Sequence, residues 1–122
     1  LKADTLTHST AGSLATNYVV EGSAKVWINF NGTGTIATRD SFNVTSITDG
    51  GTGLYTVTYT NSLGNVNYST TGAAGENDDS GGNRSLGLRA RAVGSQNLRG
   101  FRDGVSADDM AEMCIQITGD LA

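Results

Sequence analysis

The stretch that decides the fold is residues 24–68, which read AKVWINFNGTGTIATRDSFNVTSITDGGTGLYTVTYTNSLGNVNY. At its start Val26, Ile28 and Phe30 occupy every second position, and the residues between them are mostly polar. This period of two is typical of a strand that packs one face on a core. It turns Trp27 to the opposite side of the same strand.

Glycine-rich turns divide the stretch into four predicted strands. Residues 31–34 and 49–51 contain Asn-Gly, Asp-Gly and Gly-Gly pairs, which supply the positive φ angles of tight hairpins. Between these turns Phe42 and Val44 continue the apolar alternation in one strand. The following strand carries its alternating positions at Tyr55, Val57 and Tyr59. A fourth strand is expected over residues 66–70.

Two more strands are expected in the second half of the chain. In residues 85–92 the alternating positions are Leu86, Leu88, Ala90 and Ala92, and in the last strand, from about Met110, they are Met113, Ile115 and Ile117. We therefore predict an all-β protein, an antiparallel β-sandwich of about seven to nine strands. No helix longer than two turns is expected.

Composition agrees with one all-β domain and limits its chemistry. The 122 residues include 17 glycines and no proline, and the formal charge is −4, which argues mildly against nucleic-acid binding. Cys114 is the only cysteine, so no intrachain disulfide is possible, and on its strand we expect it to be a small buried side chain. No apolar run is long enough for a membrane span and no signal peptide is evident, and a chain that starts at Leu1 reads as a fragment of a longer polypeptide.

The residues of the central stretch carry a family resemblance. KVWINFNGTGTIATRDSFNVTSITDGGTGLYTVTY, followed by NVNYSTTG, resembles the C-terminal tip domain of bacteriophage tail-fibre and related virion proteins, especially those of marine and cyanobacterial phages. The lead-in LKADTL is similar to the segment that precedes this domain, and the match spans roughly residues 1–72. The resemblance implies a β-sandwich, a homotrimer and a place on the virion surface, often in host recognition.

The chain is expected to have two parts, a connector from an upstream fibre over residues 1–23 and the tip domain over residues 24–122. In the connector, residues 18–20 read as a second extended piece. His8 lies there among hydroxyl side chains and is the only histidine, so we expect no catalytic residue and no enzyme activity.

The longest loop is expected over residues 72–83. Its Glu76, Asp78 and Asp79 could bind calcium, but their spacing lacks the pattern of a calcium loop, so we expect no metal site and no cofactor. A second loop region is expected between Gly94 and Asp109. Because binding residues concentrate on loops, we place receptor binding on residues 73–83 and 94–104. The candidate receptor-binding residues are Asn77, Asp78, Asn97, Arg99 and Arg102.

Positive charge is concentrated between Arg84 and Arg102, which hold five of the eight Lys and Arg residues and none of the twelve Asp and Glu residues. Within this segment the alternation places Arg89 and Arg91 on one face of a strand. A guanidinium group can form two parallel hydrogen bonds to one phosphate or carboxylate group, such as those of lipopolysaccharide or another acidic glycan. The alternative is a structural role, in which the arginines pair with Asp103, Asp108 or Asp109 of the same chain or of a neighbouring chain.

Trp27 and the Arg89/Arg91 face are the predicted homotrimer interface, because a monomer would leave the indole in water. The alternative is that residues 14–20 fold over Trp27 within one chain. Three functional classes stay open. The first is a tail-fibre tip that attaches the virion to a bacterial surface receptor, a glycan or a protein. The others are a purely structural trimeric virion module, which contacts only other virion proteins, and a bacterial carbohydrate-binding or adhesin-like domain.

Overall fold

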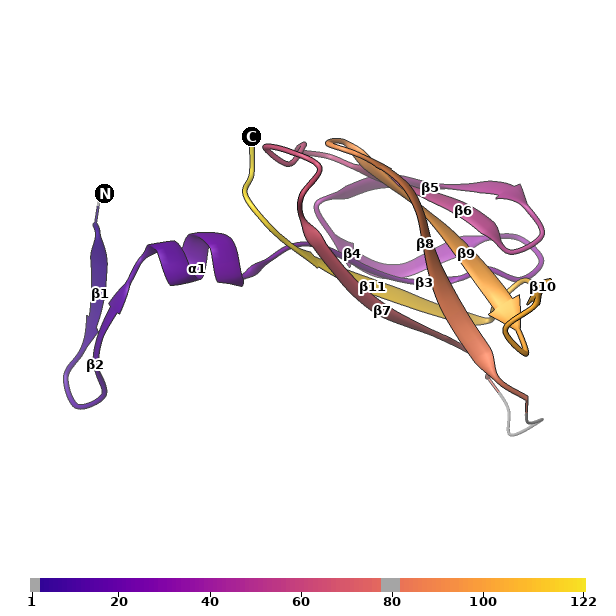
Figure 1. The fold of residues 1–122 in the computed structure, drawn as a ribbon, viewed down its shortest axis with the longest axis horizontal. Helices are drawn as coiled ribbons and strands as arrows, with labels where there is room; N and C mark the ends of the chain where they lie inside the picture. The colour runs from indigo at the N-terminus through magenta and orange to yellow at the C-terminus, as the bar shows by residue number, and fades with distance from the viewer. Residues whose placement is uncertain (1–2, 78–81) are drawn as a thin grey trace.

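The computed structural model describes residues 3–77 and 82–122 as two antiparallel β-sheets packed together, preceded by a hairpin and a helix (Figure 1). The hairpin consists of β1 (Thr5–His8) and β2 (Gly12–Ala15), and α1 spans Asn17–Gly22. The sandwich strands are β3 (Ala24–Asn31), β4 (Ala37–Phe42), β5 (Val44–Gly51), β6 (Leu54–Tyr59), β7 (Ser69–Gly75), β8 (Arg84–Ala92), β9 (Ser95–Arg102), β10 (Ser106–Ala107) and β11 (Glu112–Thr118). The predicted antiparallel sandwich is confirmed, with nine strands in its two sheets over the described residues.

The four-stranded sheet has the order β4-β3-β11-β7, and the five-stranded sheet has the order β10-β9-β6-β5, with β8 also paired to β9. In the four-stranded sheet the antiparallel register places apolar residues opposite one another on the inner side: Phe30 pairs with Met113, Ile28 with Ile115, and Val26 with Ile117. All six are buried. The alternation in the sequence therefore predicted the inner face of β3 and β11 correctly.

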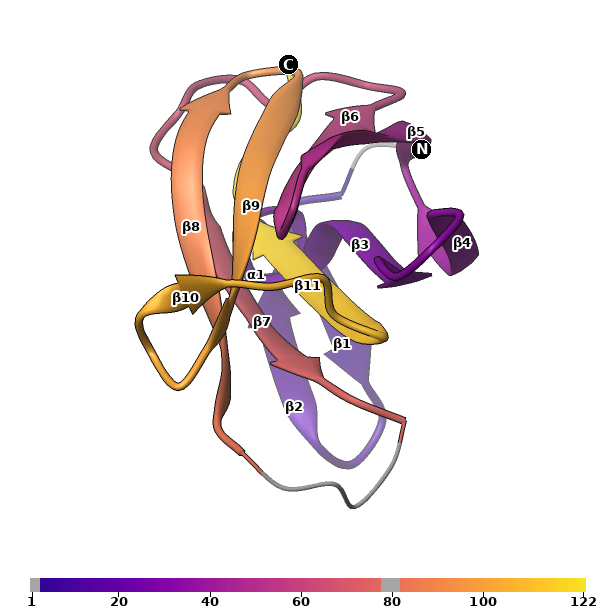
Figure 2. The same ribbon diagram turned by 90° about the vertical axis from the view of Figure 1, so that its right-hand side faces the viewer.

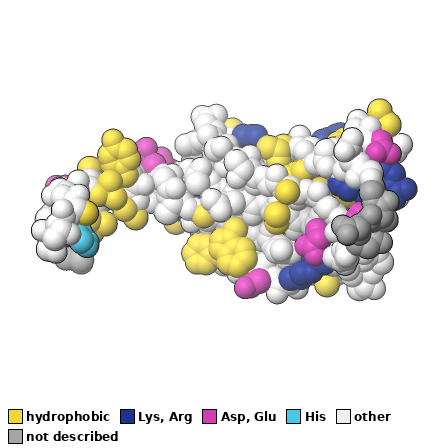
Figure 3. Space-filling view, turned by 90° about the horizontal axis from the view of Figure 1, so that it is seen from below, with side chains coloured by type: hydrophobic (Ala, Val, Ile, Leu, Met, Phe, Trp, Pro, Cys, Tyr) yellow, Lys and Arg dark blue, Asp and Glu magenta, His cyan; other side chains and the backbone are white. Residues whose placement is uncertain are grey.

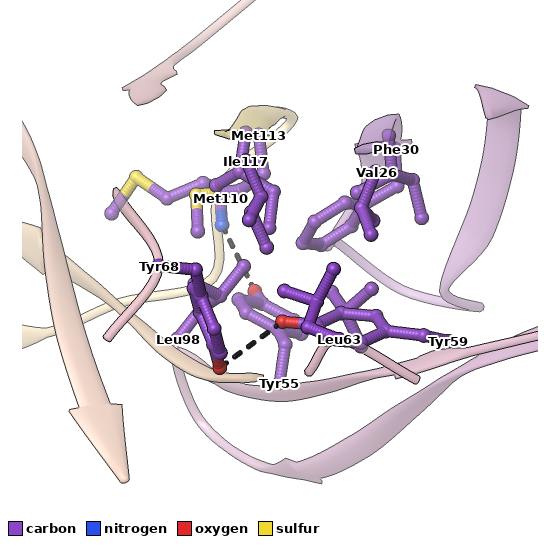
Figure 4. Packing of buried hydrophobic residues seen from close by; sticks show 13 residues of the cluster. Val26, Phe30, Tyr55, Tyr59, Leu63, Tyr68, Leu98, Met110, Met113 and Ile117 are labelled. Atoms are coloured by element: carbon purple, nitrogen blue, oxygen red, sulfur yellow. Dashed lines mark hydrogen bonds between the residues drawn. The ribbon is translucent and has the colours of Figure 1, made fainter. Parts of the chain in front are cut away.

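The core between the sheets is centred on Tyr55 (Figure 4). Its ring packs edge-on against Phe30, with the ring centroids 5.1 Å apart. Its hydroxyl donates to the carbonyl of Gly32 at 2.9 Å and accepts the backbone N–H of Met110 at 3.3 Å. Burial disfavours the charged phenolate and raises the pKa of Tyr55 to about 12, although the Met110 N–H acts in the opposite direction.

The chain crosses from one sheet to the other at Asn43, between β4 and β5. Asn43 has a positive φ of 58°, a conformation in which Asn is enriched. Its side-chain amide donates to the carbonyls of Lys25 and Asn61, both at 3.0 Å, and its side-chain oxygen accepts the N–H of Asn61 at 2.7 Å. These three hydrogen bonds stabilise the corner at which the chain leaves the four-stranded sheet and enters the five-stranded sheet.

The sandwich has two distinct ends. At the root end, α1 leads into β3 and the chain ends beside the connection between β6 and β7 (Figure 1). At the far end lie the connections over residues 32–36 and 52–53, the segment 103–111 with the short strand β10, and the two residues that flank the undescribed positions 78–81 (Figure 2). Within the described part of the chain, no helix has the length and apolar character needed to cross a membrane.

Three sequence-based expectations about local structure are wrong. Most of the expected loop between Gly94 and Asp109 is strand β9, because the inward positions of that strand include Gln96 and Gly100, which show no apolar pattern. The strand expected over residues 66–70 is β7, which begins at Ser69 and continues to Gly75, so the loop that follows it is shorter than expected. Residues 18–20 are helical instead of extended.

Candidate functional site

The five arginines of the positive segment have different surroundings. At the far end Arg84 pairs with Glu76 at 2.9 Å, and Arg102 pairs with Asp108 at 2.9 Å. The hydrogen bond to Glu76 raises the pKa of Arg84, whose side chain is only 7% exposed. For these two arginines, pairing within the protein is what the structure shows.

Arg91 is also used within the sandwich. Its guanidinium carbon lies 5.2 Å from the centre of the Tyr68 ring, and Nη1 donates to the carbonyl of Tyr68 at 3.0 Å. The register of β8 against β9 shifts between Leu88 and Arg91. This irregularity interrupts the alternation of side chains along β8, so the prediction that Arg89 and Arg91 share one face is wrong. Arg91 lies on Tyr68, whereas Arg89 lines a hollow on the other side of the sheet.

The outer side of the five-stranded sheet carries a second group of polar residues, which we call the arginine face: Thr56, Arg89, Asn97, Arg99 and Phe101. Thr56 and Asn97 are opposite one another on β6 and β9, and the Thr56 hydroxyl donates to the Asn97 side-chain oxygen at 3.1 Å. Thr56, Asn97 and Arg89 line a hollow of about 290 Å³, close to the lower limit of about 300 Å³ for small-molecule pockets.

Arg99 is held in place on this face by an aromatic ring. Its guanidinium carbon lies 5.1 Å from the centre of the Phe101 ring, and its Nε is buried with no hydrogen-bond partner among the described residues. The Phe101 ring lies over Gly87, where an added Cβ would come within 2.7 Å of a ring carbon. The absence of a side chain at Gly87 therefore leaves room for the Phe101 ring, on which Arg99 stacks.

Charge separates the arginine face from the far end. Among residues 3–77 and 82–122, no carboxylate lies within 4 Å of the guanidinium nitrogens of Arg89 or Arg99. The acidic residue nearest in sequence to the hollow, Asp49, accepts the N–H of Gly51 at 2.8 Å in its own turn. Arg89 and Arg99 therefore present positive charge that the described part of the protein does not neutralise at contact distance.

The predicted receptor-binding residues do not form one site. Asn97 and Arg99 lie on the arginine face, whereas Arg102 ends β9 about 17 Å further along the strand from Asn97 and is paired with Asp108. Asn77 is exposed at the far end, and Asp78 lies outside the described residues, as does Asp79 of the candidate calcium loop. Sequence reasoning missed Phe101 and the grouping of Arg89 with Asn97, which requires the pairing of β8 with β9.

The outer side of the four-stranded sheet is different, and we call it the aromatic face: Trp27, Phe42, Thr71, Cys114 and Gln116. The pairing of β4, β3, β11 and β7 places Phe42, Trp27, Gln116 and Thr71 in one row across the sheet. Figure 3, which views the molecule from below, shows a compact hydrophobic patch beside basic and acidic groups. Arg39 borders this face and contacts Glu112 at 3.2 Å.

Two residues of the aromatic face correct sequence-based expectations. Phe42 was expected on the apolar side of one strand with Val44, but it ends β4 and is 55% exposed, because the corner at Asn43 separates the two residues. Cys114 was expected to be buried, but it is exposed on the outer side of β11. Trp27 faces outward as predicted and is half-buried.

The described residues contain no group of three or more His, Cys, Asp or Glu side chains that could hold a metal ion. His8 ends β1 next to the turn of the hairpin, and its Nδ1 accepts the N–H groups of Thr10 and Ala11 at 3.2 and 3.1 Å. The arginine face remains the group of residues whose chemistry is best suited to a ligand. Comparison of the chain with protein-family models, curated proteins and solved structures finds no match.

Proposed function

We propose that this chain is the attachment domain at the tip of a virion fibre, that it works as a homotrimer, and that its arginine face binds an acidic glycan of the host surface. The site is inferred from two arginines, Arg89 and Arg99, that have no carboxylate partner among the described residues, and from the hollow that Arg89 lines. The proposed location on a virion and the proposed trimeric state rest on the family resemblance of residues 1–72.

The chemistry of the arginine face favours a ligand with carboxylate or phosphate groups. A guanidinium group presents donors in a planar fork that matches both anions. Asn97 accepts the Thr56 hydroxyl through its side-chain oxygen, so its amide nitrogen is left to donate to a sugar hydroxyl. The stacking of Arg99 on Phe101 reduces the conformational freedom that the side chain would lose on binding.

A glycan suits this face better than a nucleic acid does. The chain as a whole has a formal charge of −4, and the two unneutralised arginines cover a small area in place of a continuous basic stripe. The site lies on the side of the sandwich, so the proposal moves receptor binding from the far-end loops to the outer surface of a sheet. In an assembly built through the aromatic face, the arginine face of each copy points outward.

Binding to matched saccharides tests this proposal. Titration calorimetry would compare a uronic-acid oligosaccharide with a neutral oligosaccharide of the same length. We expect the chain to prefer the acidic one and Arg89→Ala/Arg99→Ala to lose affinity about tenfold or more, as for loss of a charge-assisted hydrogen bond. Arg102→Ala is the matched control, because its guanidinium is already paired, and should change affinity less than about threefold. Equal binding by the double variant and the parent chain would refute the site.

The second candidate function is a purely structural virion module. The internal pairing of Arg84, Arg91 and Arg102 favours it, because three of the five arginines are used within the protein. In that case neither saccharide binds, and phage carrying the Arg89→Ala/Arg99→Ala change adsorb to the host at the normal rate. Adsorption slowed by that change would favour attachment.

A further inference from the structure

Residues 3–22, which we call the arm, have regular structure but no core. All residues of β1, β2 and α1 are exposed. An isolated two-stranded hairpin is marginally stable in water, and so is a helix of six residues. The arm is therefore expected to need another surface to hold its structure in solution.

One side of the arm is suited to burial. Leu6 and Leu14 are directly paired across the hairpin, so their side chains share a face, and Thr7 and Ser13 pair on the other. The helix carries further exposed apolar side chains, Tyr18, Val19 and Val20, which point to different sides of α1. Residues 5–20 contain no Asp, Glu, Lys or Arg, whereas exposed surfaces of soluble domains are normally rich in charge.

The arm does not bury its apolar side chains against the sandwich of its own chain. It extends away from the sheets (Figure 1), and the predicted alternative in which residues 14–20 fold over Trp27 is not what the structure shows. The aromatic face is consequently open as well, with Phe42 exposed and Trp27 half-covered. Its central row of Phe42, Trp27, Gln116 and Thr71 is also uncharged. Residues 5–20 of the arm and the central row of the aromatic face thus carry no charged side chain and lack a partner within the described residues. Asp4 and Glu21 border the first of these surfaces, and Asp40 and Glu112 border the second.

We propose that the arm of one copy packs on the aromatic face of a neighbouring copy, so that the assembly is held together by exchanged arms. This inference rests on the assembly part of the proposed function and adds the contact that makes it. The occupant of the aromatic face is the apolar side of a second copy's arm, with Leu6 and Leu14 against Trp27 and Phe42.

Geometry favours this exchange. The arm joins the sandwich at Ala24, and Trp27 lies three residues further along the same strand, which is roughly 10 Å. Each arm therefore starts close to the aromatic side of its own sandwich, from which it can reach the aromatic face of an adjacent copy. Exchange of an identical segment between copies needs no new surface, and copies that each pass their arm to the next in one direction can close a ring. A twenty-residue arm buried along one side approaches the roughly 800 Å² per partner of a stable interface.

Cys114 provides a built-in probe for the exchange, because it is exposed on the aromatic face and is the only cysteine of the chain. The full chain with Leu14→Cys would be oxidised mildly and the products identified by non-reducing electrophoresis and peptide mass spectrometry. A disulfide forms only when the two Cα atoms come within about 7 Å. We expect a shift from monomer to covalent oligomers joined through positions 14 and 114. Ser13→Cys, on the opposite side of the hairpin, is the matched control and should give little of this product.

Each other outcome overturns the proposal in a recognisable way. Links between two copies of position 14 would show that arms pack on each other, and a 14–114 link within one chain would show that the arm folds onto its own sandwich. Sedimentation of the unoxidised chain separates this failure from failure of the proposed assembly. An oligomer without the 14–114 link rejects only the exchange, whereas a monomer at all concentrations rejects both.

Discussion

The two outer faces of the sandwich share one core but differ in chemistry. The outer side of the four-stranded sheet has Trp27 and Phe42 in an uncharged row, whereas the outer side of the five-stranded sheet has Arg89 and Arg99 without carboxylate partners among the described residues. On the central strands β3, β11, β6 and β9, the residues of each face alternate with buried ones. The comparison shows that the inward-facing side chains of the strands determine the fold, whereas the outward-facing side chains can differ in chemistry from one sheet to the other.

The largest expected effect is a change in the shared core, which should break both faces together. An added Cβ at Gly32 would collide with the hydroxyl of Tyr55 and lie within 2.9 Å of the Met110 carbonyl oxygen. We expect Gly32→Ala to lower the free energy of unfolding by about 3 kcal/mol, the sum of overpacking and a disturbed hydrogen bond. Urea unfolding would measure it.

Gly75→Ala is the control for that change. A Cβ at Gly75 would make only an ordinary contact, at 3.6 Å from the Cβ of Glu112. Its effect on the free energy of unfolding should stay within about 0.5 kcal/mol. Equal effects of the two substitutions would contradict the role given to the approach between Gly32 and Tyr55.

Alkaline pH should weaken the shared core. The pKa of Tyr55 is raised from 10.0 to about 12, so the unfolded chain loses this proton first. The stabilisation is therefore complete below pH 10 and is lost as the pH rises towards 12, by at most about 3 kcal/mol. Melting temperatures followed by circular dichroism between pH 9 and 12 would show the loss. Tyr55→Phe should be less stable at pH 8 and show a smaller fall above pH 10.

The aromatic face should affect assembly and leave the fold intact. We expect Trp27→Ser/Phe42→Ser to weaken association by about 2 kcal/mol or more per interface, as for a buried aromatic anchor. Val105→Ser, at an 81% exposed position of the far end, is the matched control and should leave association unchanged. Sedimentation equilibrium measures both. A double variant that associates as well as the parent chain would remove the aromatic face from the interface.

The smallest effect is expected at the paired arginine of the far end. Arg102 is 54% exposed where it contacts Asp108, and exposed pairs of this kind contribute about 0–1 kcal/mol. Arg102→Ala should therefore change the free energy of unfolding by less than about 1 kcal/mol. A larger loss of unfolding free energy in chemical denaturation would show that this ion pair contributes more to stability than exposed pairs normally do.

Alternation in the sequence was sufficient to predict β3, β6 and β11, whose inner positions are apolar and buried. It failed for β9 because Gln96 takes a core position there. That side chain is fully buried, and its amide donates to the carbonyl of Arg89 at 2.9 Å and to that of Asn97 at 3.0 Å. A buried glutamine whose amide is hydrogen-bonded to backbone carbonyls can replace an apolar residue with little loss of stability. Because glutamine is polar, however, the strand does not show the hydrophobic alternation from which strands are predicted.

The candidate site was harder to predict than the fold. Asn97 and Arg99 were named from the sequence, but on a loop, and their grouping with Arg89 depends on the long-range pairing of β8 with β9. Cys114 shows a different error: its position in the alternation indicated an outward side chain, and the general tendency of cysteine to be buried was given more weight. Local alternation was the better guide there.

The central claim is that one face assembles the protein and the other binds its ligand. Sedimentation velocity of a fluorescently labelled uronic-acid oligosaccharide with each variant reports both properties in one measurement. We predict that Arg89→Ala/Arg99→Ala sediments as the parent oligomer without carrying the label, and that Trp27→Ser/Phe42→Ser sediments as a smaller species that still carries it. Label that travels with the arginine variant as it does with the parent chain, or loss of label from the aromatic variant alone, would contradict the claim.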